Sequence, residues 1–151
     1  MAMINKQARI LNDLILINND RVVVYQKAIE ELKKEDDDLK LLFQGKINES
    51  KEYITQLTSK TVETGHEVET GTTNTGKIYR VWMDVKAFFG GFDRKVVLDN
   101  CENVENAALM AYNDALTSEG LSTAARSLLT TQYAALKVSY DKIKALKEAQ
   151  K

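Results

Sequence analysis

The sequence predicts an all-α protein, a single domain over residues 1–151 that forms a bundle of four long helices in two antiparallel hairpins. Three observations predict this class. Apolar side chains recur in steps of three and four residues along four segments, which is the spacing of a helix that buries one face. The chain contains no proline, and its 7 glycines leave long segments uninterrupted. The two predicted hairpins also share identical residues at a constant offset of 87 positions, an internal repeat.

The internal repeat consists of identical residues at matching positions of the two hairpins. It relates Tyr25 to Tyr112, Tyr53 to Tyr140, Leu11 to Leu98, Ala28 to Ala115, and the pair Leu41–Leu42 to Leu128–Leu129. The paired residues fall in segments that periodicity alone assigns to helices. They therefore predict a bundle with pseudo-two-fold symmetry.

The first predicted hairpin covers residues 4–62. Its first helix carries a stripe of side chains at bundle spacing: Ile4, Ala8, Leu11, Ile15, Asn18, Val22, Tyr25, Ile29 and Leu32. The acidic run 35–38 breaks this pattern and supplies a cap for a second stripe: Leu39, Leu42, Phe43, Ile47, Ser50, Tyr53, Ile54 and Leu57. A connection this short makes the two helices antiparallel neighbours. We expect Gly45, inside the second helix, to permit a close approach of another element.

A long crossover, residues 63–91, comes next. Residues 63–76 are rich in Thr, Gly and Glu without apolar spacing, and they predict a loop. Residues 77–89 predict a short amphipathic helix with one apolar face: Ile78, Val81, Trp82, Val85 and Phe88. We expect this face to dock on the flank of the bundle. The alternative is an exposed apolar face that mediates self-association or membrane-surface binding. We expect a homo-oligomer, a dimer, with the segment 77–92 as its candidate contact.

The second predicted hairpin covers residues 93–148. Its first stripe is Val97, Leu98, Cys101, Glu105, Ala108, Tyr112 and Leu116. A turn over 118–120 follows, and Ser122 is placed to cap the last helix. The last stripe is Ala125, Leu128, Leu129, Gln132, Leu136, Ser139, Ile143 and Leu146. Two hairpins joined by one long crossover have the topology of ferritin-like folds.

Four short motifs add a resemblance to this topology. They are Leu11-Asn12-Asp13-Leu14, Asn18-Asn19-Asp20-Arg21, Trp82-Met83-Asp84 and Cys101-Glu102. Over residues 10–145 the chain resembles an uncharacterised bacterial family of ferritin-like four-helix-bundle proteins, a domain of unknown function. The resemblance implies the fold but no established activity. It also implies a place in a wider group whose di-iron members bind metal at the bundle centre.

This sequence lacks most of the ligand residues that a di-iron centre of that kind requires. Such a centre takes one Glu from each of two helices and a Glu-x-x-His pair from each of the other two. Glu105 has the Glu-to-Tyr spacing of a ligand, but the matching first-helix position is Asn18. The only histidine, His66, lies in the crossover. We therefore expect no resident cofactor, and a smaller carboxylate site for iron, manganese or zinc stays open, with four candidate ligands: Glu49, Glu52, Glu102 and Glu105.

Glu105 needs a partner in any case, because its spacing places a carboxylate on a buried seam. It must be exposed at a gap, protonated, hydrogen-bonded or paired with a cation. Polar groups on the neighbouring seams form a candidate core network: Asn18, Tyr25, Ser50, Tyr53, Tyr112 and Gln132. Two interpretations of this network are open. In the first, its polar groups fix the register and pairing of the helices; in the second, they are a remodelled metal site around Glu105. We favour the structural interpretation.

Composition narrows the classes of function. The 21 basic residues balance the 22 acidic ones, so the chain lacks the electrostatic footprint of a nucleic-acid binder. No apolar run approaches the roughly 20 residues of a membrane span, and we expect a cytoplasmic protein. We identify no catalytic residues and expect a structural or interaction protein rather than an enzyme. The alternative is a metal-binding carboxylate protein with a storage or redox role.

Overall fold

A computed structural model of the chain describes residues 2–32, 36–63 and 94–150. Four helices make up nearly all of these ranges: α1 (Ala2–Glu31), α2 (Asp37–Glu63), α4 (Arg94–Thr117) and α5 (Thr123–Glu148). The described ranges contain no strand. The predicted all-α bundle of two hairpins is thereby confirmed. The expected crossover helix at 77–89 lies outside the described residues.

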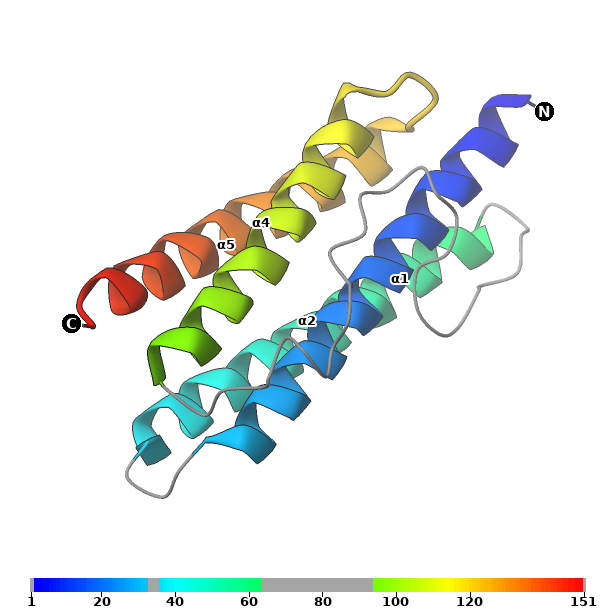
Figure 1. Cartoon of the computed structure of the whole chain (residues 1–151). Helices are drawn as coiled ribbons and strands as arrows, with labels where there is room; N and C mark the ends of the chain where they lie inside the picture. The colour runs from blue at the N-terminus through cyan, green and yellow to red at the C-terminus, as the bar shows by residue number, and fades with distance from the viewer. Residues whose placement is uncertain (1, 33–35, 64–93, 151) are drawn as a thin grey trace.

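The helices pack as two hairpins laid side by side (Figure 1). α1 packs along α2, and α4 packs along α5. The hairpins meet mainly where α1 lies against α4, whereas α2 and α5 approach each other only sparsely. The contact between the hairpins is therefore one-sided.

Contacts at the two ends of the bundle define the helix directions. Arg94, which begins α4, pairs with Asp36 at 2.8 Å and with Asp38 at 2.9 Å, beside the start of α2. At the other end the backbone N–H of Ser122, before α5, donates to Oε1 of Gln7 in α1 at 2.6 Å. α2 is thus parallel to α4, and α1 is parallel to α5. The end of α2 and the start of α4 therefore lie at opposite ends of the bundle, about 40 Å apart for a helix of 27 residues.

Local signals explain where the helices begin and end. The hydroxyl of Ser122 accepts a hydrogen bond from the N–H of Ala125 at 3.0 Å, as predicted for the cap of α5. Gly120 precedes this cap with a φ of 102°, a conformation that side chains rarely adopt. Gly45 does not behave as expected, because no described atom lies within 4 Å of the position where its Cβ would be. The close approach expected there is wrong.

The core has two apolar clusters with a polar layer between them. One cluster joins the first half of α1 to the second halves of α2 and α4, through Leu11, Leu57 and Tyr112. The other joins the second half of α1 to the first halves of α2 and α4, through Tyr25, Phe43 and Leu98. Five of the buried polar and charged side chains form this layer: Asn18, Arg21, Ser50, Glu105 and Ser139. In the described ranges, no helix has the length and apolar character needed to cross a membrane.

Candidate functional site

An ion pair between α1 and α4 forms the centre of the polar layer. Arg21 and Glu105 are each 0% exposed. Nε of Arg21 donates to Oε1 of Glu105 at 2.5 Å, and Nη2 donates to Oε2 at 3.0 Å. The two parallel bonds use both carboxylate oxygens, which is the geometry that makes arginine a strong partner for carboxylates. Although burial opposes the charge, Glu105 holds the pKa of Arg21 above its usual value.

The remaining N–H groups of Arg21 reach the other two helices. Nη1 donates to the hydroxyl of Ser50 at 2.8 Å and to the carbonyl of Lys46 at 3.4 Å, both on α2. Nη2 donates to the hydroxyl of Ser139 on α5 at 3.0 Å. A carboxylate oxygen of Glu49 on α2 also lies 2.9 Å from Nη2. All the N–H donors of the guanidinium are therefore used, and one side chain connects all four helices.

Glu105 is satisfied as completely as its partner. Besides the two bonds from Arg21, its Oε2 accepts a short hydrogen bond from the hydroxyl of Ser139. Ser139 thus accepts from the guanidinium and donates to the carboxylate. This hydroxyl therefore contacts both partners of the ion pair from the side of α5.

A chain of neutral hydrogen bonds leads away from the ion pair. Ser50 donates to Oδ1 of Asn18 at 2.8 Å, and Nδ2 of Asn18 donates to the hydroxyl of Tyr112 at 2.9 Å. Tyr112 donates to Oε1 of Gln132 at 2.6 Å. Nε2 of Gln132 then donates to Oε1 of Gln56 at 2.8 Å, on the exposed side of α2. The structure thus joins four of the residues named from the sequence, Asn18, Ser50, Tyr112 and Gln132, in one network.

The other two tyrosines named from the sequence flank the network without joining this chain. The Tyr25 ring lies 5.6 Å from the guanidinium carbon of Arg21 and 5.1 Å from the ring of Phe43. Its buried hydroxyl has no hydrogen-bond partner in good geometry among the described atoms. Burial and the charge of Glu105 raise the pKa of Tyr25 well above its usual value. Burial and Glu49 raise the pKa of Tyr53 in the same way.

The four candidate metal ligands lie in three different places. Glu105 and Glu49 both contact Arg21. Glu102 pairs with Lys147 at 2.5 Å on the flank of α4 and α5. Glu52 is exposed on α2. In the part of the chain that the structure describes, no group of three or more His, Cys, Asp or Glu side chains is placed to hold a metal ion.

A di-metal centre does not fit these residues. The place that metal ions would take beside Glu105 is filled by the guanidinium of Arg21, which has no lone pair for a metal. The helices that would supply Glu-x-x-His pairs present the small hydroxyls of Ser50 and Ser139 instead. The donor set at the centre is thus complementary to a guanidinium.

Cys101 lies in the same region and is completely buried. Burial and the neighbouring Glu105 raise the pKa of its thiol well above the usual value. A thiol that resists ionisation is a poor nucleophile. Its surroundings fit a core residue.

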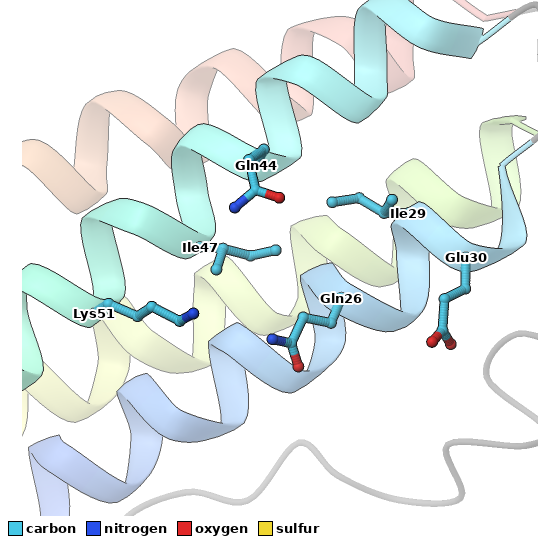
Figure 2. A pocket seen from close by; sticks show the side chains of 6 residues that line it. All are labelled: Gln26, Ile29, Glu30, Gln44, Ile47 and Lys51. Atoms are coloured by element: carbon cyan, nitrogen blue, oxygen red, sulfur yellow. The ribbon is translucent and has the colours of Figure 1, made fainter.

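A shallow groove opens between α1 and α2, and neither partner of the ion pair lines it (Figure 2). Its lining combines apolar and polar side chains of α1 and α2: Gln26, Ile29, Glu30, Gln44, Ile47 and Lys51. Glu30 and Lys51 lie toward opposite ends of it (Figure 2). The groove does not bring together charges of one sign or a set of catalytic groups.

Sequence reasoning missed Arg21, the central residue of the site. The predicted stripe of this helix passes through Val22 and gives the neighbouring Arg21 no role. One signal could have found it. Arg21 lies one helical turn after Asn18 and one turn before Tyr25, on the buried seam. A buried carboxylate at Glu105 required a cation, and Arg21 is the only basic residue between Arg9 and Lys27.

Comparison with known proteins places this site within a family. The family model described as "Domain of unknown function (DUF2383)" matches residues 6–118. The match includes α1, α2 and α4, with both partners of the ion pair, and ends before α5. A search of curated proteins gives no match. Since the match covers most of the chain, the protein belongs to the DUF2383 family of domains of unknown function.

Proposed function

We propose that this protein is a non-enzymatic helical bundle with a structural or interaction role, in which Arg21 replaces the metal of a carboxylate centre. One observation carries the proposal: both oxygens of Glu105 are bound by the guanidinium, at 2.5 and 3.0 Å. The positive charge that the carboxylate requires is therefore supplied by the chain itself.

The chemistry of the centre supports an internal cation over a metal. A metal ion beside Glu105 would have to displace Arg21, which would leave a buried guanidinium without its partner. An uncompensated buried charge costs about 3–5 kcal/mol. Besides Glu105, the groups left around the ion would be one carboxylate, that of Glu49, with hydroxyls and an amide that bind transition metals weakly compared with carboxylate and imidazole.

Elemental analysis of the purified, untagged protein tests the proposal. Cells are grown with iron, manganese and zinc supplied, and metal is measured against protein concentration. We expect far less than stoichiometric metal. Near-stoichiometric metal that is lost in Glu49→Gln but kept in the exposed control Glu52→Gln would contradict the proposal and favour the metal-binding alternative. Glu49 is chosen because its side chain is 28% exposed, so that its loss does not strand Glu105.

Self-association is a second part of the proposal. The sequence predicts a homodimer with the segment 77–92 as its candidate contact, and this segment lies outside the described residues. Sedimentation velocity over a range of protein concentrations measures it. A dimer that dissociates on dilution is expected from an interaction protein. A monomer at every concentration would remove the dimer from the proposal.

A further inference from the structure

The groove between α1 and α2 belongs to a wider surface that combines apolar and polar groups. Leu41 lies one helical turn before Gln44 of the groove and is 78% exposed, the largest exposed fraction of any large apolar side chain in the described ranges. Val23 lies one turn before Gln26 and is 40% exposed. Apolar surface therefore continues beyond both walls of the groove and meets solvent in the single chain.

The two helices present the same pattern of side chains to this surface. Each contributes an aliphatic residue, a glutamine and an isoleucine at intervals of three positions: Val23, Gln26 and Ile29 on α1, and Leu41, Gln44 and Ile47 on α2. The two glutamines lie between the ends of the groove (Figure 2). A primary amide both donates and accepts hydrogen bonds, so a glutamine can pair with a glutamine of another molecule. The amides and the apolar groups therefore suit contact between two copies of the same surface.

The charges of the groove are self-complementary as well. Glu30 and Lys51 lie toward its opposite ends, and both are exposed (Figure 2). Within its own helix Glu30 approaches Lys27 only to 3.9 Å. A two-fold axis that lies across the groove, between two facing copies, exchanges the ends of the groove. It places each Glu30 at the end where Lys51 of the second copy lies, which gives two equivalent pairs of opposite charges.

We propose that this groove, extended by Val23 and Leu41, is the contact through which two copies of the chain form a symmetric dimer. The apolar side chains leave water when the faces meet, and the charges at the two ends select the orientation of the copies. This contact rests on the self-association proposed above and gives it a surface on the described helices. It does not involve Arg21.

An exchange of charges at the ends of the groove tests the contact. Sedimentation velocity at low ionic strength measures the dimerisation constant of the full-length protein. Glu30→Lys alone and Lys51→Glu alone each bring like charges together, and each is expected to weaken dimerisation about tenfold or more. The double variant, Glu30→Lys with Lys51→Glu, restores opposite charges and should recover most of the wild-type constant. Asp114→Lys, at an exposed position of α4, makes the same change in net charge as Glu30→Lys and should leave the constant unchanged.

The apolar part of the surface is tested with Leu41→Ser. The variant is expected to weaken dimerisation several-fold, while Val138→Ser, at a position that is 69% exposed on α5, should have no effect. Circular dichroism verifies that both variants are folded.

Three outcomes would overturn the proposal. A dimer that is insensitive to Glu30→Lys and Leu41→Ser would assign the self-association to another surface. Losses in the two single charge variants without recovery in the double variant would contradict the two-fold arrangement. A monomer at every concentration would remove this contact together with the dimer proposed above.

Discussion

At the scale of single residues, Arg21 and Glu105 depend on each other for their place in the core. Each would be too costly to bury alone, and their hydrogen bonds come from each other, from Ser50 and Ser139 and from the carbonyl of Lys46. Such a pair contributes less to stability than its contacts suggest, because both charges leave water. It does make the loss of one partner severe.

Glu105→Gln is expected to destabilise the protein by about 3–5 kcal/mol, because it strands a guanidinium that is 0% exposed. Urea unfolding followed by circular dichroism measures the change. Replacing both partners, as Arg21→Met with Glu105→Leu, should recover most of the loss. Glu52→Gln on the exposed side of α2 is the control and should stay within about 0.5 kcal/mol of the wild type. A Glu105→Gln variant as stable as that control would refute the buried pair.

Tyr112→Phe removes one hydroxyl from the middle of the neutral hydrogen-bond chain. The change leaves Nδ2 of Asn18 and Oε1 of Gln132 without their bonds to it. Buried groups left without partners cost about 1–3 kcal/mol each, so we expect a loss within or somewhat above that range. Tyr133→Phe, at a half-buried position of α5, is the matched control. Equal urea midpoints for the two variants would show that the hydroxyl of Tyr112 is dispensable.

Alkaline pH should destabilise the fold through its buried tyrosines. Burial raises the pKa of Tyr25, Tyr53 and Tyr112 above the usual value. The folded chain then retains protons that the unfolded chain releases above about pH 10. The contribution to stability is therefore complete below that pH and is lost as the pH rises beyond it. Urea midpoints between about pH 8 and 11 measure the loss, and an unchanged midpoint above the usual tyrosine pKa would argue against it.

At the scale of helices and turns, two glycines have opposite roles. Gly45 lies inside α2 with open space where a Cβ would point, so Gly45→Ala should stabilise the protein by about 1 kcal/mol. Gly120 has a φ of 102°, and an added Cβ would lie 3.2 Å from Cδ of Lys6. Gly120→Ala should therefore destabilise the protein by about 1 kcal/mol or more. Thermal melts of the two variants, measured in parallel, should shift in opposite directions; shifts of the same sign would contradict this account.

The helices could be predicted from the sequence far better than the site. Spacing of apolar residues placed the hairpins at 4–62 and 93–148, within two residues of the outer ends of the helix pairs. Spacing placed Glu105 on the buried seam of its helix, but the predicted stripe of the first helix passes through Val22, beside Arg21. Arg21 was lost for that reason. Its partner lies 84 residues away, and such a pairing depends on how the hairpins meet, which no local pattern encodes.

At the scale of the whole molecule, the two hairpins are held together from one side and from the centre. α1 packs on α4, α2 hardly reaches α5, and the polar layer connects all four helices between the two apolar clusters. The predicted pseudo-symmetry remains a prediction for the backbone. Superposing residues 8–60 on 95–147 tests it, since the tyrosine pairs must then coincide.

The charged residues of the polar layer are not repeated at the offset of 87 residues. At the offset of 87 residues, Arg21 corresponds to Ala108 and Glu105 to Asn18. The first hairpin thus supplies the cation and the second supplies the anion. Two copies of the first hairpin, packed together in the same way, would bury two guanidinium groups with only the partly exposed carboxylates of Glu49 beside them, and two copies of the second would bury two carboxylates. The ion pair therefore favours the packing of each hairpin on the other, different hairpin over the packing of two like hairpins.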